Sequence, residues 1–511
     1  MKQSFRFLPW LASFVLFLGT VVRPACAELD EQIRAVLADK LLARGELGIQ
    51  IIRLGNSPGE SRTIYQYRSS VPRIPASNLK LVTTAAALEK LGSDFAFRTV
   101  LAIRQEAGAT DLAIIGDGDP TLGDAEMLRK LGWDVDTVFK TWAGMLQQRG
   151  VQRIRNLYVD DSIFDVTFAH PSWPPEQEHK RYVAQVGGIN LNANCVDFYL
   201  RIGGYGQIVD YRTNPPDTRY ISVRNACVQG SKNAVWLSRQ RGSNDVVLRG
   251  ETNANNVEPI SVTIHDPPMY AGTVLAETLV RAGVGVAGSV ERDRTIRQAM
   301  LNPGPGHAPG VGPATQSADR WIPLAVHATP LATVLARANK DSMNLYAEAL
   351  CKRLGAAATG LTGSWDNGTA AMGAFLESLG VNRDEFTIDD GCGLSKKNMI
   401  SPNAIARVLE HKFHDRDREV FLNSLAVAGI DGTFEDRFRD SDLRGRVFGK
   451  SGYVRGVASL SGYLRARDDN WYAFSILMNE VYDYASAKVL QERIVKAIDA
   501  AANEANVASG R

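Results

Sequence analysis

The chain has 511 residues, of which 45% are hydrophobic and 22% are charged, and its formal net charge is +2. This composition excludes a disordered protein, and the near-neutral charge without a long basic run gives no sign of a nucleic-acid surface. At about 150 residues per domain, the length suggests about three domains.

The N-terminus has the three-part pattern of a secretory signal. Two basic residues precede an apolar run over residues 7–22, and Ala25-Cys-Ala27 supplies small residues for a signal peptidase. We therefore predict a cleaved signal peptide over residues 1–27. The alternative is a retained membrane anchor, but the run contains Pro9 and is short for a span of about 20 residues. No later stretch is apolar enough to cross a bilayer.

The first elements after this segment predict a helix, a hairpin and a second helix. Apolar residues at helical spacing predict a helix over 28–46, strand-like runs follow over 48–54 and 63–67, and a helix follows over 77–91. The turn between the two strands matches G-x-S-x-G, with Ser57 at its centre. That motif requires a strand–turn–helix context, so we interpret it here as a hairpin turn.

The middle and the end of the chain differ in the secondary structure that their sequence predicts. Short strands with glycine turns occupy about 95–320 and end in a Pro- and Gly-rich loop over 303–313. The remaining elements are predicted as helices over 331–338, 344–354 and 368–379, strands over 457–464 and 471–478, and a helix over 485–501. Because both ends supply strands and helices, we expect one sheet assembled from both ends, with the middle inserted.

Four cysteines remain after the predicted cleavage, and no C-x-x-C occurs. In an oxidising compartment an even number suggests pairing, with three possible connectivities. Cys195 and Cys227 lie in one strand-rich region and are the preferred disulfide, while Cys351 and Cys392 are a second pair or two buried thiols. The histidines show no ligand pattern, so we expect no metal and no cofactor.

Three short motifs could carry chemistry, and each is weak alone. In Ser77-Asn-Leu-Lys80, residues i and i+3 of a helix share a face, so Lys80 can take the proton of the Ser77 hydroxyl. Ser342-Met-Asn344 opens a predicted helix, and Lys450-Ser-Gly452 begins the C-terminal strands. S-x-x-K, S-D-N and K-T-G together are the signature of penicillin-binding proteins and class A β-lactamases. All three motifs occur here in that order, each in a fitting local structure, so together they are a specific signal although each is weak alone.

With these motifs the chain resembles the class C low-molecular-mass penicillin-binding proteins, the D-alanyl-D-alanine carboxypeptidase/endopeptidase family. Further matching stretches lie at 118–122, 161–164, 390–395 and 428–433. The resemblance implies an α/β (α+β) serine D,D-peptidase or β-lactamase-like transpeptidase domain, an antiparallel sheet flanked by helices, with a large strand-rich insertion. The domains we expect are the peptidase domain over 28–95 and 321–505, an inserted domain II over 96–195 and 262–320, and an inserted domain III over 196–261.

The resemblance also implies a reaction and roles for particular residues. Ser77 would attack a D-Ala bond of a peptidoglycan stem peptide or cross-link, with β-lactams as covalent inhibitors. The expected catalytic residues are Ser77, Lys80, Ser342, Asn344 and Lys450. The expected substrate-binding residues are Ser451, Gly452, Tyr453 and, in the insertion, Asp161. The family also suggests a periplasmic location.

Three departures from the family pattern bear on this reading. Ser451 replaces a threonine but keeps the hydroxyl, and Cys392 replaces a serine. Tyr453 stands where the family has a small hydroxyl residue that helps to hold the substrate carboxylate, which would favour endopeptidase over carboxypeptidase activity. The competing interpretations are a non-catalytic wall-binding scaffold, which would not need the whole motif set, and a β-lactamase, for which we find no deacylating glutamate motif.

Overall fold

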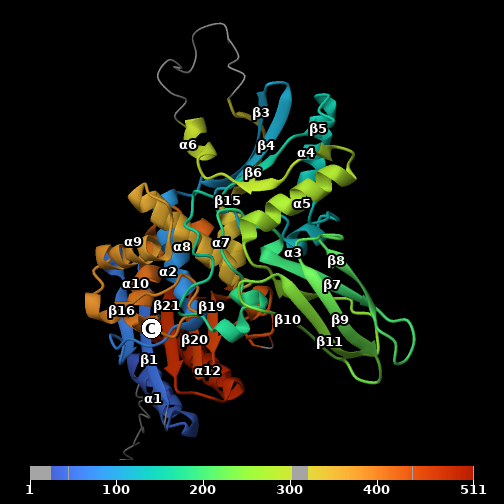
Figure 1. Cartoon of the computed structure of the whole chain (residues 1–511). Helices are drawn as coiled ribbons and strands as arrows, with labels where there is room; N and C mark the ends of the chain where they lie inside the picture. The colour runs from blue at the N-terminus through green and yellow to red at the C-terminus, as the bar shows by residue number, and fades with distance from the viewer. Residues whose placement is uncertain (1–24, 44, 302–319, 440, 510–511) are drawn as a thin grey trace, which may run out of the picture.

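The computed structural model describes residues 25–43, 45–301, 320–439 and 441–509. Its central element is a six-stranded sheet in the order β18-β19-β20-β21-β1-β2. The strands of this sheet are β1 Glu46–Leu54, β2 Arg62–Tyr67, β18 Ala426–Val427, β19 Val447–Val454, β20 Val457–Arg465 and β21 Trp471–Asn479. The antiparallel pairing of β1 with β21 joins the two ends of the chain, where blue and red strands lie side by side (Figure 1). The expected single sheet from both chain ends is therefore confirmed.

Alternation along β1 explains why this sheet is covered on both faces. Ile49 and Ile51 belong to the apolar cluster with helices α1 and α12, whereas Ile52 and Leu54 belong to the cluster with the remaining helices. Successive strand residues point to opposite faces, so these odd- and even-numbered side chains enter different cores. The helices are α1 Ala25–Leu37, α2 Leu79–Leu91, α7 Leu331–Asn339, α8 Asn344–Thr359, α9 Trp365–Ser378, α10 Pro402–His414, α11 Arg418–Asn423 and α12 Tyr484–Ser509.

The first part of the chain follows the prediction, with one difference in helix length. β1 and β2 form the expected antiparallel hairpin, and Ser57 lies in its turn, ahead of the short 3₁₀ helix Pro58–Glu60. The predicted helix over 28–46 instead ends at Leu37, and a separate 3₁₀ turn follows over Lys40–Leu42. Asp39 caps that turn by accepting from the Leu41 N–H, a side-chain bond that competes with continuing the α-helix.

A second, five-stranded sheet lies in the insertion, in the order β14-β6-β4-β3-β15. Its strands are β3 Ala96–Glu106, β4 Ala109–Ile115, β6 Leu157–Asp160, β14 Val290–Arg292 and β15 Ile322–Pro330. Helices α4 Thr137–Gln148 and α5 Pro267–Arg281 contribute to the apolar core of this region. β15 lies in the part of the chain that we assign to the peptidase domain, and it pairs with β3, which lies in the predicted insertion.

Two three-stranded sheets complete the insertion, in the orders β12-β7-β8 and β10-β11-β9. Their strands are β7 Cys195–Arg201, β8 Asp210–Asn214, β9 Ser222–Gln229, β10 Ala234–Arg239, β11 Asp245–Thr252 and β12 Ile260–Thr263. The smaller elements of the chain are β5 Arg153–Ile154, β13 Gly285–Val286, β16 Phe386–Thr387, β17 Met399–Ile400, α3 Ala125–Arg129 and α6 Ile296–Leu301. The exact division of the chain into domains stays a prediction.

The predicted disulfide between Cys195 and Cys227 is wrong for this structure. Both thiols are free and buried, and Cys195 lies on β7 whereas Cys227 lies on β9, in a different sheet. Closeness in sequence did not place the two thiols together, and each fills core space instead. Cys351 and Cys392 are likewise free and buried, so of the two alternatives given for them they are two buried thiols and not a second disulfide.

Two predicted segments lie at the margins of the structure. The predicted signal segment, residues 1–27, lies almost wholly outside the described residues, and the predicted loop over 303–313 lies entirely outside them. Across the described ranges, no helix has the length and apolar character that a membrane span requires.

Candidate active site

Ser77, Lys80 and Asn344 meet at one point of the peptidase domain. The Lys80 amine contacts the Ser77 hydroxyl oxygen at 2.9 Å and donates to the Asn344 side-chain oxygen at 2.7 Å. It also donates to the backbone carbonyl of Cys392 at 2.9 Å. Three oxygens therefore surround one buried amine, and one of them belongs to a half-buried serine hydroxyl.

Local structure places these side chains. Ser77 lies in the 3₁₀ turn Ala76–Asn78, which runs directly into α2, so Lys80 follows it by one turn on the same face. Asn344 is the first residue of α8, which packs against α2. The predicted helix start at Ser77 is thus tighter than an α-helix, and the α-helical part begins at Leu79.

Strand β19 closes the other side of the serine. Gly452 lies so close to the serine turn that a Cβ placed on it would be 2.9 Å from both the Pro75 carbonyl oxygen and the Ser77 nitrogen. The Ser459 hydroxyl on the neighbouring strand β20 donates to the same Pro75 carbonyl at 2.6 Å. Only a residue without a side chain lets the strand approach the nucleophile this closely.

Lys450 is buried on the same strand, and its amine donates to the Ser451 carbonyl at 2.9 Å. Within the described ranges, no carboxylate lies within 4.0 Å of it. Burial, and then the charge of Lys80, lowers the pKa of Lys450 well below its usual value, while Asp341 opposes this shift. An incoming carboxylate would oppose this shift and favour the charged form of the amine.

Burial also lowers the pKa of Lys80, and the negative charges of Glu348 and Asp390 oppose the shift. The direction is the one a general base requires, because a lysine can accept a proton only when its amine is neutral.

The other predicted residues differ in how directly they reach the serine. Ser342 is half-buried with a left-handed φ of 58°, and its hydroxyl makes no hydrogen bond to any described residue. Ser451 is half-buried next to Lys450. The Tyr453 side chain is 57% exposed and packs on Tyr484, with ring centroids 4.4 Å apart.

Asp161 is not part of this group. Its buried carboxylate lies 3.5 Å from Arg292 and 3.3 Å from Arg294 inside the insertion. Because two arginines already face it, direct contact of Asp161 with a substrate stays a prediction that these contacts do not support.

Sequence reasoning missed three groups that hold the site together, which are the Glu348 carboxylate and the backbone carbonyls of Cys392 and Tyr182. The loop bearing the Cys392 carbonyl is fixed by Glu348, whose carboxylate accepts from the N–H groups of Gly391 and Cys392 and from Trp365. Burial, and then the charge of Asp390, raises the pKa of Glu348 to about 7. The Asn344 amide donates at 2.8 Å to the carbonyl of Tyr182, which comes from the insertion. Two of these three groups are backbone carbonyls, which leave no signature in a sequence.

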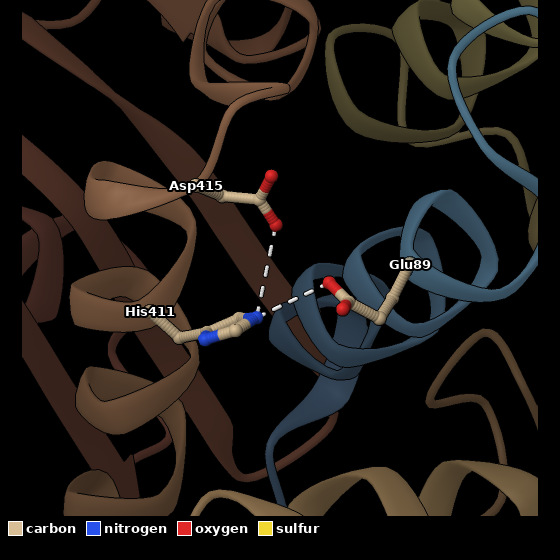
Figure 2. A group of neighbouring side chains, drawn as sticks. All are labelled: Glu89, His411 and Asp415. Atoms are coloured by element: carbon tan, nitrogen blue, oxygen red, sulfur yellow. Dashed lines mark hydrogen bonds and ion pairs between the residues drawn. The ribbon is translucent and has the colours of Figure 1, made fainter.

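A separate surface group, Glu89, His411 and Asp415, has the composition of a cation site (Figure 2). His411 bridges the two carboxylates, at 3.1 Å from Glu89 and 3.7 Å from Asp415. The buried amine of Lys412 also donates to both carboxylates. Since an ammonium already neutralises this group, we interpret it as an ion-pair network that fastens α10 to α2.

A serine whose hydroxyl contacts a buried, pKa-lowered lysine defines a class of serine acyl-transfer enzymes. The model of the D-Ala-D-Ala carboxypeptidase 3 (S13) family matches residues 29–302 and 294–501. A D-alanyl-D-alanine carboxypeptidase of Actinomadura sp. is 30% identical over 474 residues, covering 88% of this chain and 81% of that protein. The chain therefore belongs to the S13 family of D-Ala-D-Ala carboxypeptidases and is a serine peptidase.

Two further comparisons agree with this assignment. The D-alanyl-D-alanine carboxypeptidase DacB of Haemophilus influenzae is 23% identical over 440 residues, covering 82% of this chain and 83% of that protein. The crystal structure of penicillin binding protein 4 (dacB) from the same organism has a TM-score of 0.69 at 20% identity, covering 95% of this chain and 98% of that one. The latter likeness confirms the expected fold, including the inserted domains.

Proposed function

We propose that this enzyme cleaves D-Ala-containing bonds of peptidoglycan stem peptides and cross-links through an acyl-enzyme on Ser77. The observation that carries the proposal is the surroundings of the Lys80 amine. A neutral amine has two N–H bonds and one lone pair. Two of its three neighbours, the Asn344 side-chain oxygen and the Cys392 carbonyl, only accept hydrogen bonds. The lone pair is then left for the third neighbour, the Ser77 hydroxyl.

In the acylation step, Ser77 Oγ attacks the scissile carbonyl while its proton passes to Lys80. The backbone N–H groups of Ser77 and Tyr453 would bind the oxyanion that develops. Ser342, whose hydroxyl has no partner among the described residues, would relay the proton that Lys80 has taken to the leaving amine as the C–N bond breaks. Water then hydrolyses the ester, which regenerates the serine.

Lys450 and Ser451 would attract the carboxylate at the end of the substrate. The absence of a carboxylate within 4.0 Å of Lys450, among the described residues, supports this role. Tyr453 contributes a large exposed ring at this point instead of a small hydroxyl. We therefore propose that endopeptidase activity on cross-links exceeds carboxypeptidase activity on free D-Ala-D-Ala ends.

The N-terminal pattern over residues 1–27 supports export, and the family supports a periplasmic location. A β-lactam should acylate Ser77, since a β-lactam resembles the D-Ala-D-Ala end. Penicillin binding protein 4 of Haemophilus influenzae has been crystallised in complex with a β-lactam, and that structure has a TM-score of 0.64 to this chain at 21% identity.

The proposal is tested by incubating the mature protein with a fluorescent penicillin, beside a folded Ser77→Ala control. We expect a stable adduct on the Ser77 peptide by mass spectrometry, and none on the control. Rapid hydrolysis of the drug without an adduct would indicate a β-lactamase. Intact drug on folded protein would indicate a non-catalytic scaffold. Digestion of muropeptides then measures the ratio of the two peptidase activities.

A further inference from the structure

The insertion contains an open cleft of about 670 Å³ that the proposed chemistry does not use. It lies where helix α3 and the segment after it face strands β7 and β8. Its walls include two aromatic residues, Trp133 and Tyr199, and the Trp133 side chain is 53% exposed. A cleft of this size accommodates a peptide segment of a few residues.

The carboxylates that line this cleft are mostly neutralised by other groups. Glu258 forms a two-pronged ion pair with Arg129, at 2.9 and 3.0 Å. Asp134 pairs with Lys140 at 3.0 Å, and Glu126 pairs with Arg337 at 3.0 Å.

The remaining carboxylate, Asp197, is only 4% exposed and accepts from Ser261 and Asn192. Burial raises its pKa, which disfavours the charged form. The cleft therefore has little negative charge that is free to repel an anion.

Two arginines of the lining remain without such a partner. Arg181 and Arg212 have no carboxylate within 4.0 Å in the described part of the chain; Asp124 and Asp197 act on Arg181 only from farther away. The Arg212 guanidinium lies over the ring of Tyr199, 4.3 Å from its centroid. A guanidinium held on a ring in this way is suited to bind a carboxylate, and the adjacent aromatic faces are suited to bind the apolar parts of a peptide.

Two short chains of contacts connect this cleft with the serine site. Arg181 directly precedes Tyr182, whose carbonyl accepts from Asn344. On the other wall, Glu126 contacts Arg337, and Arg337 contacts Asp341 at 2.6 Å, next to Ser342. Both chains of contacts therefore lead from the cleft to the second catalytic motif, one to Asn344 and the other to the residue before Ser342.

We infer that this cleft is a second binding subsite for the acidic portion of the substrate peptide, with Arg181 and Arg212 as its carboxylate ligands. The inference rests on the proposed function and adds a preference to it, for stem peptides that carry a free carboxylate away from the scissile bond. Arg212 contacts none of the catalytic residues, so it affects substrate binding separately from the chemical step.

The kinetic test uses three substrates. One is a pentapeptide that ends in D-Ala-D-Ala and contains a γ-linked D-glutamate, the second is the same peptide with that glutamate carboxylate amidated, and the third is a blocked tripeptide ending in D-Ala-D-Ala. We expect Arg212→Gln to raise KM for the acidic pentapeptide about 10-fold, from the loss of one charged hydrogen bond. The kcat value, the KM values of the other two substrates and the penicillin acylation rate should not change. The control is Arg224→Gln, an exposed arginine on β9 outside the cleft.

A binding test separates this inference from the proposed function. Calorimetric titration of Ser77→Ala protein measures binding of the acidic and the amidated pentapeptide without turnover. Binding that favours the acidic peptide and weakens about 10-fold with Arg212→Gln supports the subsite even if the wild-type protein cleaves nothing. Equal binding of the two peptides, an unchanged KM in Arg212→Gln, or equally tight binding of an unrelated glutamate-rich peptide would overturn the inference.

Discussion

The contact between Gly452 and the serine turn permits a sharp steric test, the substitution Gly452→Ala. The added Cβ would lie 2.2 Å from the Ser459 hydroxyl oxygen and 2.9 Å from two backbone atoms, the Pro75 oxygen and the Ser77 nitrogen. The serine hydroxyl can rotate away, but the two backbone atoms cannot. An ordinary contact begins at 3.4 Å, so strand β19 and the turn must separate by about 0.5 Å.

That displacement moves the nucleophile relative to the backbone N–H of Tyr453, the other proposed oxyanion donor. A misplacement of about 1 Å can cost about 100-fold in rate, so we expect penicillin acylation of Gly452→Ala to slow by about 10- to 100-fold. Overpacking should reduce the free energy of unfolding by about 1–3 kcal/mol. Stopped-flow acylation and chemical denaturation measure the two effects.

The matched control is Gly59→Ala in the exposed hairpin turn, where an added Cβ meets nothing within 4 Å. This variant should acylate at the wild-type rate. Acylation of folded Gly452→Ala at the wild-type rate would refute the steric argument, and with it the close approach of β19 to the nucleophile.

Three further predictions concern protonation and thiols. The free energy of unfolding should fall by up to about 3 kcal/mol as pH rises from 4.5 to 7, because the raised pKa of Glu348 makes its ionisation costlier in the folded state than in the unfolded state. Denaturation measured across this pH range should show no such fall in Glu348→Gln. The acylation rate should rise with pH as Lys80 loses its proton, with a midpoint below the usual lysine value of 10.5; a midpoint at or above 10.5 would contradict its role as base. A thiol reagent should label all four described cysteines without reductant, but only after denaturation. Labelling of only two cysteines would show that the other two form a disulfide.

The nucleophile and its base could be predicted because their relation is local. Residues three apart in a helix share a face, so the spacing of Ser77 and Lys80 already implied their contact. The hairpin and the two C-terminal strands were predictable for the same kind of reason, since their periodicity lies within single segments. Asn344 needed the additional knowledge of the family motif, because 264 residues separate it from Lys80.

The elements that the sequence did not reveal depend on long-range pairing. Strand β15 follows the region that appeared to end the insertion, yet its partner β3 lies more than 200 residues earlier. Cys195 and Cys227 are 32 residues apart and were expected to pair, but different sheets hold them. Local propensity cannot predict either outcome, because each depends on which strands, distant in sequence, pair in a given sheet.

The departure at Cys392 becomes understandable from the contact that this residue makes. Lys80 contacts its backbone carbonyl, and Glu348 contacts its backbone N–H, so neither interaction depends on the side chain. The thiol is fully buried and lies beside two carboxylates, those of Asp390, at 3.9 Å, and Glu348. A serine or a cysteine at this position can therefore keep the same two backbone contacts.

The insertion takes part in the active site. Its residue Tyr182 accepts a hydrogen bond from the same Asn344 side chain whose oxygen accepts from Lys80. One amide thus has both ends occupied, with its nitrogen fixed by the insertion and its oxygen fixed by the base. The insertion therefore helps to position the Asn344 oxygen against the amine of the proposed base.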